Sequence, residues 1–216
     1  MQEVLASDYS VALLCGTEAF LQGCRHADRA REVVETSEKQ LSALGSVETN
    51  NAALAVVRMK PATEPRITSD TFSLVLDDIR DPGNLGTIIR TADWYGMRQV
   101  VASEETADVY SPKVINATMG SFLRVSVHYV ALEKFLSTVK VPVFGTFLDG
   151  EDIHRVPFGK GGLLIIGNES RGISPGVARL VTKKVTIPRY GQAESLNASV
   201  ATAVLLDNLR RGQGRA

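Results

Sequence analysis

The chain has 216 residues, enough for one full domain or for a small domain and a larger one. Lys and Arg together number 24, as do Asp and Glu, so no overall basic charge indicates nucleic acid, although a local basic patch would suffice to bind it. With 44% hydrophobic residues, no apolar run of the ~18 residues that a membrane span needs and no signal-peptide pattern, the composition is typical of a cytoplasmic protein and excludes a membrane protein.

The first 60 residues are expected to form a small partial α/β domain. The stretches 11–21 and 52–59 are strand-like and flank a polar middle that is predicted to be helical. This part carries six basic and eight acidic side chains. Residues 60–70, KPATEPRITSD, hold two prolines and no apolar periodicity, which indicates a linker. We therefore assign residues 1–60 to the small domain, 61–69 to the linker and 70–216 to a larger domain.

The larger domain alternates between short apolar runs and helix-like stretches. Strands that are apolar on both faces, each followed by a helix, predict a mostly parallel sheet covered on both sides. Ligands of such sheets lie beyond the carboxyl ends of the strands, in the loops that lead into helices. The predicted strands are 72–78, 99–103, 124–130, 141–148, 162–169 and 183–188, and the predicted helices are 84–95, 113–121, 131–139, 174–182 and 196–211.

Several common catalytic patterns are missing from the sequence. It has no phosphate-binding loop G-x-x-x-x-G-K-[ST], no H-E-x-x-H, no C-x-x-C and no G-x-S-x-G. Cys15 and Cys24 form neither a metal-ligand pattern nor a disulfide framework, which favours a reducing compartment. His26, His128 and His154 are scattered. We expect no metal site and no histidine base.

The first polar loop follows the strand at 72–77 and reads DDIRDPGN. Pro82-Gly83 predicts a turn, and Asn84 is expected to be the N-cap of a helix that ends at Gly96. Arg90 lies roughly 9 Å along that helix, and its long side chain could fold back towards the loop. A capped helix with an ordinary surface arginine is the alternative interpretation.

The second polar loop, IIGNESRGIS, closes the strand at 162–167. Gly167 allows close backbone approach at the end of the strand. Glu169 and Arg171 make this loop richer in polar groups than a turn requires. The alternative is a self-contained turn in which these two side chains pair with each other.

The third polar loop, IPRYGQAESLN, precedes the last helix. Ser195 or Asn197 is sufficient to cap that helix, so the other side chain is spare. Exposed amides at a helix start favour anions or carbonyl-type ligand groups. A doubly capped core helix is the alternative.

Taken together, the three loops resemble the motifs of a known enzyme family. NLGTIIRTAD, IIGNESRGI and IPRYGQAESLNASVATA are similar, in order and spacing over residues 70–211, to the three motifs of the SpoU (TrmH) family of RNA ribose methyltransferases in the SPOUT superfamily. The resemblance implies a parallel sheet with a C-terminal trefoil knot, in which residues 184–211 pass through the preceding loop. It also implies S-adenosylmethionine as cofactor, held by residues at Gly145, Thr146, Gly167, Ile187 and Leu196.

The resemblance also implies a role for each remaining motif residue. Arg90 is the family's proposed catalytic residue. We expect it to act as a cation that holds the RNA phosphate and steadies the developing oxyanion, because a guanidinium does not readily lose its proton. Asn84 and Glu169 would orient Arg90 and the substrate. Ser195 and Asn197 would fix the loop and reach the ribose. The family is homodimeric, with the site at or near the subunit contact.

The front part of the chain departs from the family pattern. It resembles the later part of a ribosomal-protein-like RNA-binding domain, without the usual opening basic helix and first strand. Either the start is truncated or this part serves another purpose. RNA contact would then fall to arginines of the larger domain and tail, of which we expect about half to contribute: Arg80, Arg124, Arg171, Arg189, Arg210, Arg211 and Arg215.

The sequence thus predicts a cofactor-dependent RNA 2′-O-methyltransferase that acts on ribosomal RNA, with transfer RNA as the second candidate substrate. A protein that keeps the fold and binds RNA without catalysis is the alternative of a different class. A dinucleotide oxidoreductase is disfavoured because the glycine fingerprint is missing.

Overall fold

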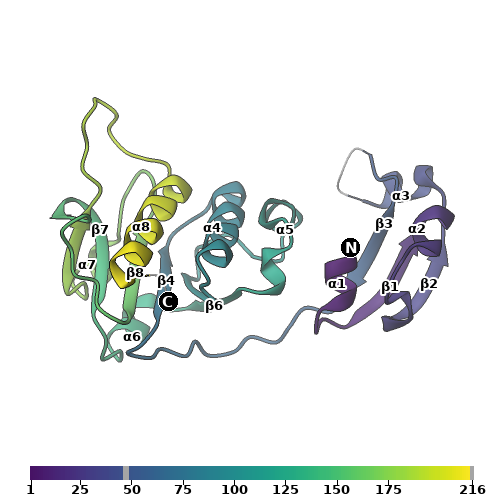
Figure 1. The fold of residues 1–216 in the computed structure, drawn as a ribbon, viewed down its shortest axis with the longest axis horizontal. Helices are drawn as coiled ribbons and strands as arrows, with labels where there is room; N and C mark the ends of the chain where they lie inside the picture. The colour runs from purple at the N-terminus through teal and green to yellow at the C-terminus, as the bar shows by residue number, and fades with distance from the viewer. Residues whose placement is uncertain (46–48, 215–216) are drawn as a thin grey trace. The chain divides into compact units, whose positions relative to one another are not determined.

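A computed structural model describes residues 1–45 and 49–214, which form two compact units, Met1–Pro61 and Ala62–Ala216. In the first unit (Figure 1), β1 (Val11–Gly16) is the central strand, parallel to β2 (Ala30–Glu35) and antiparallel to β3 (Ala53–Val57). The unit also contains α1 (Gln2–Ala6), α2 (Glu18–Gln22), a 3-10 turn at Ala27–Arg29 and α3 (Glu38–Leu44).

The prediction of a helical middle in this unit was wrong in part, because β2 lies there. Only Ala30 of this strand is buried, and the five residues that follow are exposed. An edge strand that is exposed on both faces lacks the alternating apolar pattern by which strands are identified. The small core consists of Leu5, Val11, Leu14 and Ala30.

The second unit is built on six strands in the order β6-β5-β4-β8-β7-β9, all parallel to their neighbours. The parallel sheet that was predicted from the alternating pattern is therefore confirmed. Its strands are β4 (Phe72–Asp77), β5 (Gln99–Ser103), β6 (Ser126–Val130), β7 (Val143–Asp152), β8 (Gly162–Gly167) and β9 (Lys183–Thr186).

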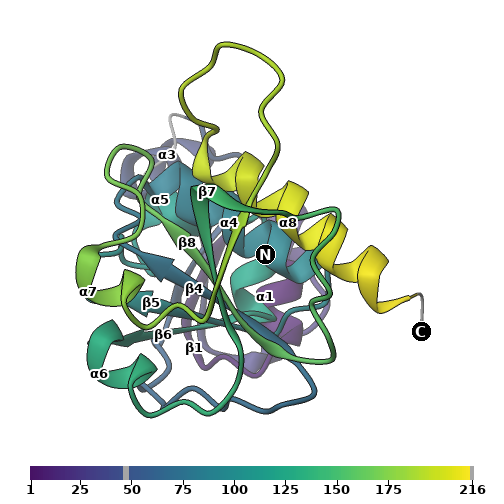
Figure 2. The same ribbon diagram turned by 90° about the vertical axis from the view of Figure 1, so that its left-hand side faces the viewer.

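Helices cover both faces of this sheet (Figure 2). The core on one face joins α4 (Pro82–Trp94), α5 (Pro112–Thr118) and α8 (Ala198–Gln213) to the sheet. The core on the other face joins α6 (Leu132–Leu136) and α7 (Pro175–Ala178) to it. A 3-10 turn at Ser121–Leu123 completes the unit.

Side chains of the central strands alternate between the two cores. In β4, Leu74 and Leu76 face α4 and α8, whereas Val75 faces α6 and α7. All six residues of β4 are buried. A strand with no solvent-exposed face reads as a continuous apolar run, which is why these strands could be recognised from the sequence.

The predicted linker does not run free over its whole length, since residues 62–69 belong to the second unit. Gln99 Oε1 accepts a hydrogen bond from the Arg66 backbone amide at 3.1 Å, and His128 Nδ1 lies 2.7 Å from the Thr63 carbonyl oxygen. These contacts fix the segment along the edge where the strands begin. Within residues 1–45 and 49–214, no helix has the length and apolarity needed to cross a membrane.

Candidate active site

The sheet register brings the first two polar loops together. Asp77, the last residue of β4, pairs with Gly167, the last residue of β8. Because the two strands are parallel neighbours, the loops that follow them leave the sheet side by side. Asp77 Oδ2 accepts a hydrogen bond from the Ser174 amide at 2.7 Å, and Asn168 Nδ2 donates to the Asp78 carbonyl at 2.8 Å. The two loops are therefore locked to each other.

The helix α4 begins differently from the prediction. Asp81, not Asn84, is the N-cap, and its side chain accepts a hydrogen bond from the Asn84 amide at 2.8 Å. Pro82 occupies the first helical position, which suits its fixed φ and missing N–H. The expectation that Asn84 caps the helix was wrong because Asp81 lies one turn earlier and is an equally good cap. The Asn84 side chain is therefore available for other contacts.

The Asn84 side chain joins all three polar loops. Its Nδ2 donates to Glu169 Oε1 at 2.5 Å, and its Oδ1 accepts from Asn197 Nδ2 at 2.8 Å. The three residues come from the start of α4, the loop after β8 and the start of α8. A hydrogen bond to an ionised carboxylate contributes about 1.5 to 3 kcal/mol, so this chain of contacts is a substantial part of the local structure.

Of the two candidate caps of α8, Ser195 and Asn197, the structure has Asn197 as the N-cap. Its Oδ1 accepts from the Ser199 and Val200 amides at 3.0 and 3.3 Å. Ser195 is exposed and lies two residues before the cap. Asn197 thus serves as cap and as link to Asn84, whereas Ser195 is the spare polar group.

Substituting these two residues separately should therefore have different effects. Asn197→Ala should lower the stability by about 1 kcal/mol, because the α8 cap is lost, and should lower the melting temperature by about 2–4 °C. Ser195→Ala should leave the melting temperature unchanged. Both variants should lower the methyl transfer that the family resemblance implies, as measured by radiolabel incorporation into RNA. Full turnover in both variants would show that this helix start has no role in the reaction.

The loop after β8 closes into a tight turn. Asn168 and Gly172 exchange backbone hydrogen bonds of 3.1 and 2.8 Å, and Gly172 has a φ of 68°. A Cβ atom at Gly167 would lie 2.3 Å from the Gly172 carbonyl carbon, so the turn requires glycine there. The alternative pairing of Glu169 with Arg171 does not form. Glu169 instead contacts Asn84, and Arg171 lies 3.7 Å from Asp78.

A cleft of about 980 Å³ opens beside this turn. Its lining joins residues 146–149 of β7 and the loops after β8 and β9 to the first half of α8. Of the predicted site residues, six contribute to the lining: Thr146, Gly167, Glu169, Ile187, Ser195 and Leu196. Leu196 has 46% of its surface exposed and Tyr190 has 93%, so apolar and aromatic groups face solvent around the cleft. A site of this size is suitable for a small organic cofactor.

Four predicted site residues do not line the cleft. Asn84 and Asn197 contact each other, and Asn84 also contacts the lining residue Glu169. Gly145 is buried beneath it, where a Cβ atom would lie 2.7 Å from Val181 and 2.8 Å from Phe147. Arg90 is exposed on α4 and forms no hydrogen bond or ion pair with the described residues.

Three residues of this region were not predicted. Asp81 is the cap of α4, Asn168 joins two loops, and Asp78 adopts a φ of 62°. The pair Asp81-Pro82 is a sequence signal for a cap followed by the first helical residue, and it could have identified the cap. Among the described residues, no group of three or more His, Cys, Asp or Glu is placed to hold a metal ion.

A second and larger cavity, of about 1660 Å³, lies at the end of the sheet where the strands begin. It is lined by residues that precede β4, β5, β6 and β8 and by the end of α8. None of the predicted site residues lies there. Because ligands of parallel sheets bind at the carboxyl ends of the strands, the smaller cleft is the candidate active site.

Solved structures share this fold and define the class of protein. A putative RNA methyltransferase of the TrmH family from Porphyromonas gingivalis matches with a TM-score of 0.88 and 37% identity, over 97% of this chain and 86% of that one. An AdoMet-bound rRNA methyltransferase from Sinorhizobium meliloti matches with a TM-score of 0.88 and 28% identity, over 99% and 84% of the two chains. The class that this fold and site define is the RNA methyltransferases.

The sequence comparisons identify the family. Residues 71–207 match the model of the SpoU rRNA Methylase family. The 23S rRNA (guanosine(2553)-2′-O)-methyltransferase RlmP of Bacillus subtilis is 36% identical over 178 residues, which are 81% of this chain and 71% of that protein. The chain belongs to the SpoU rRNA methylase family, and the resemblance noted from the three motifs is confirmed.

Proposed function

We propose that this protein transfers a methyl group from S-adenosylmethionine to a ribose 2′-hydroxyl of 23S ribosomal RNA in the cytoplasm. The observation that carries the proposal is the chain of contacts Asn197–Asn84–Glu169, which joins the three family motifs at the wall of one cleft. The names of the relatives support the substrate class.

The cleft suits the cofactor in size and in chemistry. We expect Ile187 and Leu196 to pack against the adenine, and the backbone around Gly167 and Thr146 to supply hydrogen bonds. Gly145 would act indirectly, by letting Phe147 and Val181 pack closely beneath the cleft. When bound, S-adenosylmethionine supplies a methyl group that is already activated for transfer. The residues of the chain then need only to align the ribose 2′-oxygen with the methyl group and to assist the loss of the hydroxyl proton.

Arg90 is proposed to hold the phosphate beside the target ribose and to stabilise the oxyanion that develops on the 2′-oxygen. Its exposed position outside the cleft of its own chain supports an action at the subunit contact of a homodimer. Trp94, one turn further along α4, has 85% of its surface exposed and would be covered by such a contact. Asn84, fixed by Glu169 and Asn197, would position the substrate.

The C-terminal segment is proposed to form a trefoil knot. The strand β9 pairs with β7 at one edge of the sheet, whereas α8, which follows it, packs on α4 and β8 in the middle. The loop between them, residues 187–197, stands out from the body of the second unit (Figure 2). The chain therefore returns over the strands that it has just left, as a threaded segment would. The first unit is proposed to assist RNA binding.

Calorimetry and transfer of a tritiated methyl group test the proposed function. The wild-type protein should bind S-adenosylmethionine and should label ribosomal RNA from a strain that lacks the protein. Gly167→Ala is the matched control, because its Cβ atom would clash with the backbone of the turn and deform the cleft. We expect that variant to bind no cofactor. Labelling of transfer RNA instead would redirect the substrate assignment, and cofactor binding without labelling of any RNA would favour a non-catalytic RNA-binding protein.

A further inference from the structure

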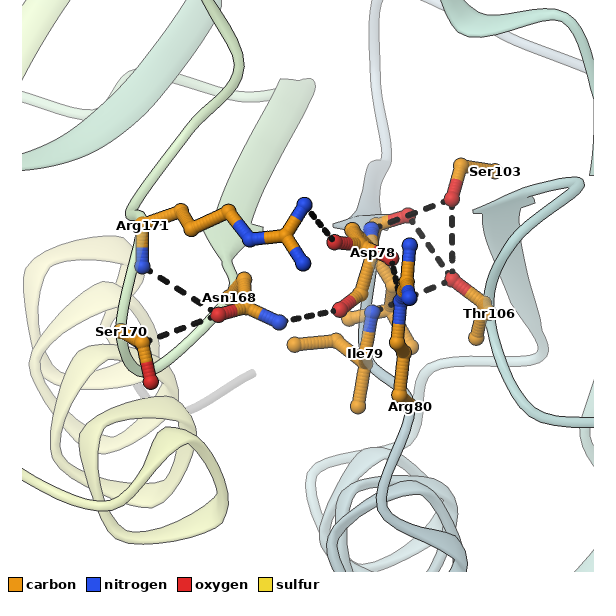
Figure 3. A network of polar contacts seen from close by, with 9 residues as sticks. Asp78, Ile79, Arg80, Ser103, Thr106, Asn168, Ser170 and Arg171 are labelled. Carbon is orange, nitrogen blue, oxygen red and sulfur yellow. Dashed lines mark hydrogen bonds and ion pairs between the residues drawn. The ribbon is translucent and has the colours of Figure 1, made fainter.

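Two arginines meet at one carboxylate beside the candidate active site (Figure 3). Asp78 Oδ1 accepts a hydrogen bond from Arg80 Nε at 2.5 Å, and Asp78 Oδ2 lies 3.7 Å from Arg171 Nη1. The two arginines come from different loops, one after β4 and one after β8. Arg80 and Arg171 are called the arginine pair below, and Asp78 is the carboxylate that they share.

Asp78 is held rigidly by its backbone. It has a left-handed φ of 62°, its amide donates to Ser103 Oγ at 3.0 Å, and its carbonyl accepts from Asn168 Nδ2 at 2.8 Å. Asn168 Oδ1 in turn accepts from the Arg171 amide at 3.2 Å. Figure 3 shows Asn168 reaching from one loop to the other. The carboxylate and the origin of Arg171 are therefore fixed relative to each other.

The charges of the cluster are not balanced. Asp78 has only 16% of its side chain exposed, whereas Arg80 has 56% and Arg171 has 69%. The bond to Asp78 raises the pKa of the Arg80 guanidinium, to which Glu105 adds a weaker attraction. Two guanidinium groups thus share one mostly buried carboxylate. Their outer donors face solvent, in an arrangement that suits an oxyanion.

The arginine pair adjoins the reaction site. Arg171 lines the cofactor cleft, two residues after Glu169, and Arg80 precedes the cap of α4, four residues before Asn84. The arginine pair therefore lies on the same two loops as Asn84 and Glu169, beside which the target ribose is proposed to bind, so we expect a neighbouring phosphate of the same RNA strand there. Phosphate contacts set the register of a bound nucleic acid.

We infer that Arg80 and Arg171 bind one phosphodiester of the RNA strand next to the methylated ribose, and that Asp78 is the positioning residue that orients both guanidinium groups. This inference rests on the proposed function. It assigns to Asp78 a role in substrate alignment, which a merely structural carboxylate would not have.

Substitution of each arginine tests the inference on the full chain. Arg80→Gln and Arg171→Gln should each raise the KM for ribosomal RNA about tenfold and should reduce the salt dependence of RNA binding by about one phosphate contact. The cofactor Kd from calorimetry should not change. Arg98→Gln is the matched control, because Arg98 is exposed at the opposite edge of the same sheet, directly before β5. That variant should have the KM of the wild type.

The variant Asp78→Asn tests whether the orientation of the two guanidinium groups matters, or only the positive charge of the patch. Asparagine tolerates the left-handed conformation, so the fold should persist, as a thermal melt would verify. The variant removes a negative charge, and an unorganised basic patch would then bind the RNA substrate more tightly. A positioned pair should instead lose about tenfold in kcat/KM for the substrate, while affinity for unrelated RNA rises.

Three results would overturn the inference: an increased kcat/KM in Asp78→Asn, an unchanged KM in both arginine variants, or a weakened cofactor Kd in Arg171→Gln, which would assign that arginine to the cofactor carboxylate. If the wild-type protein labels no RNA, the proposed function fails. The arginine pair is then judged by the RNA affinity and salt dependence of the same variants.

Discussion

Arg90→Ala should abolish methyl transfer, with kcat reduced at least ~100-fold, as is usual when a group that stabilises developing charge is removed. The cofactor Kd should remain that of the wild type, because Arg90 does not line the cleft. Arg90→Lys should recover little activity, since an ammonium group cannot reproduce the planar, two-donor geometry of a guanidinium. The measurements are single-turnover transfer to ribosomal RNA and calorimetric titration of the cofactor. Equal turnover in Arg90→Lys would contradict a geometric role for the guanidinium.

Mixing two inactive variants shows in which chain Arg90 acts. Arg90→Ala keeps its cleft but lacks the guanidinium, and Gly167→Ala keeps the guanidinium but lacks a usable cleft. If Arg90 serves the cleft of the other subunit, a randomly mixed population of dimers regains about one quarter of the wild-type activity, because half of the dimers carry one complete site. No recovery after verified subunit exchange would place the action of Arg90 within its own chain.

Asn84→Asp should reduce kcat about 100-fold, equivalent to ~3 kcal/mol. The Asn84 amide that donates to Glu169 would become a carboxylate 2.5 Å from another carboxylate, and two such groups cannot both stay ionised at that distance. Glu169→Gln alone should cost far less, because a glutamine oxygen can still accept the bond from Asn84 Nδ2.

The double variant Asn84→Asp/Glu169→Gln is the decisive member of this set. Its glutamine amide can donate to the new carboxylate, which also still accepts from Asn197 Nδ2. Activity should therefore rise at least ~10-fold above that of Asn84→Asp, and a double-mutant cycle would report the coupling between the two positions. Single and double variants should be compared by thermal melting as well. Additive losses would mean that the contact between Asn84 and Glu169 has no part in the reaction.

Most of the parallel sheet could be predicted from the sequence, because its central strands are buried on both faces. The run at 72–77 is buried throughout and is bounded by polar loops, so its pattern has few interpretations. The edge strand β2, at 30–35, was missed because it has one buried residue and no apolar face. A strand is recognised in a sequence by its buried apolar residues. An edge strand such as β2 is held by backbone hydrogen bonds, which leave no apolar pattern in the sequence.

The candidate site could be predicted as a set of loops, but not as a set of contacts. Parallel strands end at the same edge, so the approach of residues 84, 169 and 197 followed from the fold. Which atom bonds to which did not follow, because several partners of similar chemistry were available within one turn. The alternative interpretation paired Glu169 with Arg171, whereas Glu169 contacts Asn84. The left-handed conformation of Asp78 likewise did not follow from the sequence, because only a minority of Asp residues adopt it.

Because Asp81 caps α4, helix stability and the contacts of the candidate site depend on two different side chains, Asp81 and Asn84. Substitution of Asp81 should therefore change mainly the thermal stability, and Ser or Thr at this position should lower the melting temperature only modestly. The Asn84 side chain is not needed as a cap and instead joins Glu169 to Asn197. An engineer could therefore stabilise or loosen the start of this helix without retuning the reaction, and a library that varies both positions should show nearly independent effects.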